Sequence, residues 1–420
     1  MDRFAIVGGK KLSGTVSVSG AKNSALPVIA AALLPEGRVV LENVPDVMDV
    51  RTMIKLVEHL GSTVTFRRNT LSMHTPRIRR RTAPYDMVRK MRASYYVLGS
   101  LLGRERAARV SLPGGCAIGP RPIDLHIKGL RALGTEIEIE NGYIRATARH
   151  LKGGKISMQG AKGTSVGATI NIMLAAVMAD GITEITPAAC EPEVVDVADF
   201  LNVSGADISG AGTGRISIRG GRPLSGCTYR IIPDRIEAGT FAVAAAISRG
   251  RIRIERCTPS HLSAVLEVLK GIGVDLEVGT SHIVVVGRPR LSPVDVFVAP
   301  YPGFPTDMQA QVMALLAVVS GTSTIKETIF ENRFMQAMEL VRMGADITIE
   351  GDTAVIRGVK HLTGAYVMAS DLRASASLVL AGLVGRGTSV VRRIYHLDRG
   401  YEKFEHKLRT LGADIRREKE

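Results

Sequence analysis

The chain has 420 residues, more than one hydrophobic core normally serves, so two domains are expected. A composition of 45% hydrophobic and 23% charged residues is typical of a globular protein and excludes a disordered or fibrous one. The net charge of +15 fits nucleic acid, an acidic membrane surface or an anionic small molecule as partner, but with 4% aromatic residues the stacking surfaces of single-strand binders are scarce.

No segment indicates export or insertion into a membrane. The N-terminal residues lack the long apolar core of a signal peptide. The longest apolar runs, 25–34 and 378–384, are well below the roughly 18 residues that a spanning helix needs. The four cysteines form no CxxC pair, so we expect free thiols in a reducing cytoplasm and no metal site.

One phrase recurs six times along the chain: the end of a helix, a glycine, and then an alternating strand. Its glycines are Gly61, Gly134, Gly205, Gly273, Gly344 and Gly412. They are separated by 68 to 73 residues, a regularity that chance does not produce. Glycine after a helix adopts a left-handed conformation that ends the helix and turns the chain into a strand. The sequence therefore predicts an α/β (α+β) protein of six repeats.

A second phrase keeps the same spacing, with a helix rich in Ala, Ser and Val, then glycine, then a β-branched strand. Small side chains on every side of a helix indicate that it is buried. One repeat is too small to bury its own faces, so we expect three repeats around a shared core in each of two domains. An open solenoid is the alternative, although repeats of this length lie outside its usual range.

The predicted boundaries place residues 21–230 in one domain and 1–20 plus 231–420 in the other, with a cleft between them. The first strand precedes the first repeat and would join the second domain. The chain would then cross twice between domains.

A loop with the sequence GGCAIGPRPIDLH spans Gly114 to His126. Its glycines and prolines predict a long shaped connection. Cys116 lies within it near Arg121, an environment that favours the thiolate. The alternative is a surface thiol without a function.

The openings of the buried helices carry the next candidates. Lys22 and Asn23 stand where a cation is disfavoured unless an anion compensates it, which indicates a phosphate or carboxylate ligand, the alternative being an exposed lysine. Ser165 opens another such helix with free amides. The openings PDRIEAGTF, FPTDMQAQ and SDLRASAS each add an acid.

Asp307 in FPTDMQAQ would be a carboxylate inside a cationic cleft and a candidate general base. The alternative is an ordinary first-turn acid favoured by the helix dipole. Arginines recur at repeat ends and openings, and they suit the planar oxygens of carboxylates and phosphates. These arginines are Arg92, Arg333, Arg373 and Arg399.

Eight motifs together resemble the UDP-N-acetylglucosamine 1-carboxyvinyltransferase family of enolpyruvate transferases, from end to end of the chain. They are GAKNSALP, LPGGCAIGPRPIDLH, SVGATINIM, EPEVVDVADFLN, FPTDMQAQ, FENRFMQAMEL, DLRASASLVLAG and YHLDRGYE. The resemblance implies a two-domain inside-out α/β barrel with three repeats per domain and the active site between the domains. It also implies transfer of the enolpyruvyl group of phosphoenolpyruvate to the 3'-hydroxyl of UDP-N-acetylglucosamine, the committed step of peptidoglycan synthesis.

The resemblance assigns roles to individual residues. Cys116 is similar to the family's proton donor, which can bond covalently to phosphoenolpyruvate, and Asp307 is similar to the base that acts on the sugar hydroxyl. Phosphoenolpyruvate would be held by Lys22, which is also assigned to catalysis, with Asn23, Arg121 and Arg399. The nucleotide sugar would contact Arg92, Arg121, Pro122, Ile123, Asp124, Leu125, Ser165, Val166, Asp307 and Ile329, and the cleft would be lined by Arg333, Asp371 and Arg373.

One departure affects a phosphate ligand. Two residues separate Lys162 from Ser165, where the family pattern has one, so the resemblance carries over Ser165 but leaves Lys162 open. No cofactor and no metal are implied. The expected partners are the two small-molecule substrates, without nucleic acid or membrane insertion, for a cytoplasmic monomer.

Two other functions remain as alternatives. 5-Enolpyruvylshikimate-3-phosphate synthase has a similar fold and the same donor, but it does not rely on a loop cysteine. A basic protein that binds RNA or processes RNA ends, built on related repeats, would explain the net charge.

Overall fold

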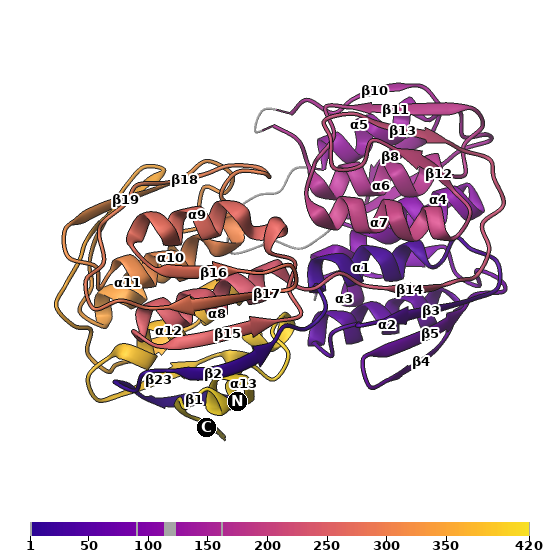
Figure 1. The fold of residues 1–420 in the computed structure, drawn as a ribbon. Coiled ribbons are helices and arrows are strands. Elements are labelled where there is room, and N and C mark those ends of the chain that lie inside the picture. Colours follow the sequence, from indigo (N-terminus) through magenta and orange to yellow (C-terminus); the bar gives the residue numbers. More distant parts are fainter. Residues whose placement is uncertain (1, 90, 113–122, 161–162, 420) are drawn as a thin grey trace. The chain divides into compact units, whose positions relative to one another are not determined.

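The computed structural model describes residues 2–89, 91–112, 123–160 and 163–419 (Figure 1). These residues form two compact units. Unit 1 contains residues 2–19 and 233–419, and unit 2 contains the described residues from 20 to 232. Within the described ranges, no helix combines the length and apolar character needed to cross a membrane.

Unit 2 is built on three four-stranded sheets with the orders β14-β3-β5-β4, β6-β7-β9-β8 and β10-β11-β13-β12. Its helices are α1 (Lys22–Ala31), α2 (Met48–Leu60), α3 (Tyr85–Val88), η1 (Arg92–Tyr96), α4 (Val97–Glu105), α5 (Asp124–Ala132), α6 (Val166–Ala176) and α7 (Pro192–Val203). Its strands are β3 (Arg38–Glu42), β4 (Thr63–Arg67), β5 (Thr70–His74), β6 (Thr82–Ala83), β7 (Ala107–Ser111), β8 (Glu136–Glu140), β9 (Tyr143–Thr147), β10 (Lys155–Ser157), β11 (Ile182–Thr186), β12 (Asp207–Ser209), β13 (Ile216–Arg219) and β14 (Thr228–Arg230).

Unit 1 repeats this plan with the sheets β16-β17-β15-β2, β18-β19-β21-β20 and β22-β23-β1-β24. Its helices are α8 (Arg235–Ile247), η2 (Pro259–Leu262), α9 (Ser263–Ile272), η3 (Thr306–Met308), α10 (Gln309–Leu316), α11 (Met335–Arg342), α12 (Leu372–Val384), η4 (Ile394–Arg399) and α13 (Phe404–Thr410). Its strands are β1 (Asp2–Val7), β2 (Ser13–Ser17), β15 (Arg251–Glu255), β16 (Asp275–Val278), β17 (His282–Val286), β18 (Val296–Val298), β19 (Thr322–Glu327), β20 (Asp346–Glu350), β21 (Thr353–Arg357), β22 (Tyr366–Met368), β23 (Thr388–Arg392) and β24 (Asp414–Lys419).

All six sheets have the same pattern of pairing. In the sheet of β18 to β21, β18 runs parallel to β19, and β19, β21 and β20 then alternate in direction. The six repeat glycines that the sequence singles out all have a positive φ, between 87° and 126°. The predicted repeats, and the left-handed glycine that ends a helix in each, are therefore confirmed.

The sheets at the two crossings are completed by strands from elsewhere in the chain. β2 runs parallel to β15 in unit 1, and β14 takes the matching position beside β3 in unit 2. β1 lies between β23 and β24, where Phe4 is opposite both Val391 and Arg417. The first residues of the chain therefore complete two sheets of unit 1.

Three helices form the core of each unit. In unit 2, α4 packs against both α1 and α6, and in unit 1, α8, α10 and α12 all pack against one another. Figure 1 shows sheets on the outside of these helices in each unit. In α8 every residue from Ile236 to Ile247 is buried. Helices inside and sheets outside confirm the predicted inside-out α/β barrel.

Close packing of the core helices generates a prediction at Gly99 of α4. A Cβ there would lie 2.2 Å from the carbonyl oxygen of Asn171 in α6, a backbone atom that cannot turn aside. We expect Gly99→Ala to lower the free energy of unfolding by about 2 kcal/mol or more, since overpacking outweighs the better helix propensity of alanine. At Gly214 a Cβ would meet nothing within 4 Å, so Gly214→Ala is the control. Equal urea midpoints for the two variants would contradict the packing argument.

Candidate active site

The charged cluster of unit 1 is centred on Asp307 in η3, directly before the core helix α10. Nη2 of Arg333 lies 2.8 Å from its Oδ1, and Nη2 of Arg373 lies 2.7 Å from its Oδ2. The two arginine side chains are only 6% and 4% exposed, whereas that of Asp307 is 26% exposed. The structure thus brings together three of the predicted residues and leaves the carboxylate partly open to solvent.

Electrostatics at Asp307 has two opposing causes. Burial raises the pKa of the carboxyl group, but the charges of Arg373 and then Arg333, with their hydrogen bonds, outweigh it and hold the pKa well below its usual range. The carboxylate is therefore ionised at neutral pH. Two guanidinium groups around one carboxylate leave a net positive charge, which suits an anionic ligand.

Asp371 fixes the position of Arg373. It is the N-cap of α12, and its Oδ1 accepts hydrogen bonds from the backbone N–H groups of Arg373 at 2.8 Å and Ala374 at 3.1 Å. Two further candidates lie in the same unit. Arg399 ends η4 and is half-buried, and Ile329 packs against the hydrophobic core.

In unit 2, Lys22 is the first residue of α1, as the sequence predicts. Its Nζ lies 3.0 Å from Oδ2 of Asp49, a carboxylate in the first turn of α2 whose side chain is 4% exposed. Asp49 supplies the compensating anion from within the chain. The position of Lys22 by itself therefore does not require a ligand. Asn23 follows it and is half-buried.

Ser165 is the N-cap of α6 and accepts a hydrogen bond from the backbone N–H of Ala168 at 3.3 Å. Val166 then begins the helix. Asp124 and Leu125 begin α5, directly after Ile123. Ser165 and Val166 therefore lie at a helix opening, as expected. The predicted end of the loop at His126 is wrong, because Asp124, Leu125 and His126 already belong to α5.

Sequence reasoning missed His126, which lies in α5 just after these candidates. It is buried, and its Nδ1 lies 3.0 Å from Nδ2 of Asn171. Burial, and then the charge of Arg92 at the start of η1, lowers its pKa to about 3. The imidazole of His126 in α5 is therefore neutral at neutral pH. The quoted loop motif contains His126, but the motif alone does not reveal that it is buried.

Several predictions fall outside the described residues and stay predictions. They concern Cys116, Arg121, Pro122 and Lys162. The cysteines that the structure does describe, Cys190, Cys227 and Cys257, are free thiols. The described part of the chain contains no group of three or more His, Cys, Asp and Glu side chains able to hold a metal ion.

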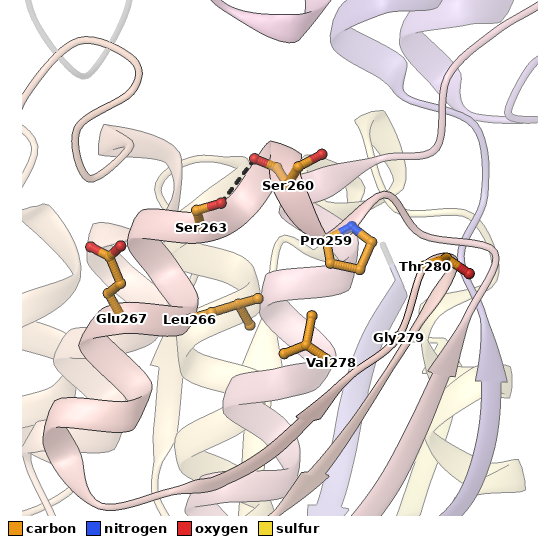
Figure 2. A pocket seen from close by; sticks show the side chains of 8 residues that line it. All are labelled: Pro259, Ser260, Ser263, Leu266, Glu267, Val278, Gly279 and Thr280. Atoms are coloured by element: carbon orange, nitrogen blue, oxygen red, sulfur yellow. Dashed lines mark hydrogen bonds between the residues drawn. The ribbon is translucent and has the colours of Figure 1, made fainter.

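A surface pocket of about 500 Å³ in unit 1 lies between η2, α9 and the turn from β16 to β17 (Figure 2). Its lining contains hydroxyl groups, such as that of Ser263, and one acid, Glu267, but no basic residue. This composition does not suit an anionic ligand. The pocket is therefore not the candidate site.

Asp196 of α7 anchors the start of α1. Its carboxylate accepts hydrogen bonds from the hydroxyl of Ser24, in the first turn of α1, and from that of Tyr229 in β14 at 2.6 Å. Burial raises the pKa of Asp196 to about 6, although these hydrogen bonds oppose the shift. The residue lies in the quoted motif EPEVVDVADFLN, but its sequence pattern does not distinguish it from a surface acid.

The comparisons with known proteins first define a class. The sequence profile of EPSP synthase (3-phosphoshikimate 1-carboxyvinyltransferase) matches residues 6–408. The structure of the enolpyruvyl transferase NikO from Streptomyces tendae matches with a TM-score of 0.89 and 28% identity, over 99% of this chain and 98% of that one. EPSP synthase from Acinetobacter baumannii has a TM-score of 0.78 at 20% identity over the full length of both chains, and so supports the fold alone. The chain belongs to the enolpyruvyl transferase family.

Curated relatives then narrow the comparison. A protein of Desulfosudis oleivorans named UDP-N-acetylglucosamine 1-carboxyvinyltransferase is 54% identical over 99% of both chains. A protein of the same name from Geobacter metallireducens is 53% identical over the full length of both. The resemblance found in the sequence motifs is therefore confirmed along the whole chain.

Asp196 should make unit 2 sensitive to pH. Its pKa in the folded state, about 6, is above the reference value of 3.8, so its protonation stabilises the fold below that reference value and the contribution is lost as pH rises through about 6. The loss corresponds to about 3 kcal/mol. Asp196→Asn does not titrate, so its free energy of unfolding relative to wild type should rise by most of this amount, about 2 kcal/mol, from pH 4 to pH 7.

Tyr229→Phe removes a hydrogen bond that lowers this pKa, so it should enlarge the pH dependence. Urea unfolding at several pH values measures both variants. A difference between Asp196→Asn and wild type that stays constant with pH would contradict the assignment.

Proposed function

We propose that the protein transfers the enolpyruvyl group of phosphoenolpyruvate to the 3'-hydroxyl of UDP-N-acetylglucosamine and releases phosphate, the committed step of peptidoglycan synthesis. The observation that carries this proposal is the identity of 52% to 54%, over nearly the whole chain, with relatives named for that activity. The net positive charge of the Asp307, Arg333 and Arg373 cluster supports it, because phosphoenolpyruvate and the nucleotide sugar are both anions.

The proposed chemistry is addition followed by elimination. The sugar hydroxyl attacks C2 of phosphoenolpyruvate while C3 gains a proton, and loss of a proton from C3 then expels phosphate. Cys116 is the proposed donor of the proton to C3. Lys22, Asn23, Arg121 and Arg399 are proposed to hold phosphoenolpyruvate, where fixed cations stabilise the charge of phosphate and carboxylate. No redox step is required.

Asp307 is proposed to accept the proton of the attacking hydroxyl. Its pairing with Arg333 and Arg373 keeps it ionised and ready to accept a hydrogen bond, but it also makes the carboxylate a weak base. The hydroxyl must therefore loosen at least one of these ion pairs before the proton is fully transferred. The Asp307 side chain is partly exposed, so the hydroxyl can reach its carboxylate.

The remaining assignments are also proposals. The nucleotide sugar is expected to contact Arg92, residues 121–125, Ser165, Val166 and Ile329, with Arg333, Asp371 and Arg373 lining the cleft. Lys22 and Arg92 lie in unit 2 and Asp307 lies in unit 1, and the active site expected between the two domains stays a prediction. The expected cytoplasmic location and monomeric state remain predictions.

The two alternatives are less well supported. The similarity to EPSP synthase of Acinetobacter baumannii is 20% in identity, far below that to the relatives named above. RNA binding rests on the net charge of +15 alone. A steep dependence of RNA affinity on salt concentration would favour that alternative.

The deciding experiment measures phosphate release from phosphoenolpyruvate by the purified protein. We expect release with UDP-N-acetylglucosamine and none with shikimate 3-phosphate, since the relatives at more than half identity carry the former name. Product should be confirmed by mass spectrometry as the enolpyruvyl ether. Release with shikimate 3-phosphate alone would overturn the proposal in favour of the other enzyme.

The role of Cys116 can be tested by chemical labelling. Because Cys116 lies in a glycine-rich segment near Arg121, its thiol should ionise more readily than the other three, and an epoxide carrying a phosphonate should modify it selectively. Burial raises the pKa of Cys257 to about 11, so that residue should react slowly. Cys116→Ala should lose both labelling and turnover. Peptide mass spectrometry that located the label on another cysteine would refute the role.

A further inference from the structure

A buried chain of polar groups lies behind Asp307 in unit 1. It contains Thr240 of α8, Gln311 of α10 and Tyr401, which follows η4. Thr240 and Gln311 are fully buried and Tyr401 is 3% exposed. Three different elements of the core therefore meet at one set of side-chain hydrogen bonds.

The direction of each hydrogen bond in this chain follows from the number of available hydrogens. The hydroxyl of Thr240 donates its single hydrogen to the carbonyl oxygen of Ile236 at 2.7 Å. Thr240 is then the acceptor from the hydroxyl of Tyr401, 2.8 Å away. Nε2 of Gln311 lies 3.2 Å from the Tyr401 oxygen and donates to the backbone carbonyl of Asp307 at 3.0 Å.

The orientation of the Gln311 amide is fixed by the same partners. Its nitrogen faces oxygen atoms of Asp307, Tyr401 and Thr240. Turning the amide would place an oxygen against the carbonyl oxygen of Asp307, which repels it. The chain therefore has one arrangement, running from the carbonyl of Asp307 to the carbonyl of Ile236.

Tyr401 is also linked to Asp307 through Arg373. The guanidinium of Arg373, which pairs with Oδ2 of Asp307, lies over the Tyr401 ring, with its Cζ 5.4 Å from the ring centroid. The hydroxyl of Tyr401 thus supports the backbone of Asp307 through Gln311, and its ring supports the arginine that pairs with the carboxylate. Both the backbone and the carboxylate of Asp307 are therefore linked to Tyr401.

We propose that Tyr401 is a positioning residue that sets the location of the Asp307 carboxylate through Gln311 and Arg373. This inference rests on the proposed function, in which Asp307 accepts the proton of the attacking hydroxyl. Small displacements of such a group slow a reaction strongly, whereas substrate binding by other cations persists. Tyr401 itself needs no contact with a substrate.

The test is Tyr401→Phe, which keeps the ring under Arg373 and removes the hydroxyl. We expect kcat to fall by on the order of tenfold to a hundredfold, with KM for both substrates changed by less than about twofold. Asp307→Asn removes the proposed base and so shows how far kcat falls when its function is lost completely. Thr240→Val should show the same fall in kcat. Thr240→Ser keeps the hydroxyl, so its kcat should stay close to that of wild type.

Ser377→Ala is the matched control. Ser377 lies fully buried in α12, the helix that carries Arg373, and donates to the carbonyl of Ala374 at 2.8 Å. Ser377→Ala should lower the thermal stability by an amount similar to that of Tyr401→Phe, while its kcat stays at the wild-type level. A fall in kcat for this control equal to that of Tyr401→Phe would reduce Tyr401 to a structural role and overturn the inference.

A second readout separates this inference from the proposed function. Carbon NMR of the aspartate side chains should show that the pKa of Asp307 rises in Tyr401→Phe, because the Asp307 backbone, no longer supported through Gln311, shifts and its ion pair with Arg373 loosens. This rise is expected whichever reaction the protein catalyses. No enolpyruvyl transfer by wild type would refute the function, whereas an unchanged pKa of Asp307 would refute the positioning role.

Discussion

The structure depends on helices that have no polar face. In α8, α10 and α12 nearly every residue is buried, so each helix must be enclosed on all sides. One sheet cannot do this, and three sheets around three helices can. Small side chains allow the helices to approach closely, as Gly99 does against Asn171, and the sheets then carry their polar faces outward.

Such helices can carry charge only where they begin, and the charged groups described there pair with partners in their own unit. Lys22 is paired with Asp49, and Asp307 with Arg333 and Arg373. Glu237 in the first turn of α8 is paired with Lys407 at 2.6 Å and also accepts the backbone N–H of Ser19 at 2.7 Å. Burial raises the pKa of Glu237, and the lysine opposes the shift. Ion pairs within each unit therefore fix these charged side chains at the helix openings without a substrate.

Features with a local cause could be predicted from the sequence. The repeat glycines have a backbone conformation that few other residues adopt, so their spacing revealed the six repeats. The pairing of β14 with β3 could not be predicted, because a strand of three residues has too little alternation to identify a distant partner. At the site, the helix openings, the recurring arginines and the motif resemblance all selected Asp307, Arg333 and Arg373, but they did not predict that Asp307 pairs with both arginines. Asp49, Asp196 and Tyr401 escaped notice since their burial depends on packing between distant segments.

The position of β1 between β23 and β24 bears on how the chain folds as it leaves the ribosome. The described residues of unit 2 all lie between residues 20 and 232, so this unit can form while synthesis continues. β1 and β2 are made before unit 2, yet their partners in unit 1 come from residues 251 to 419, which are made after it. β1 and β2 therefore lack these partners while unit 2 is being made, and in this interval their edges are open to pairing with a neighbouring molecule.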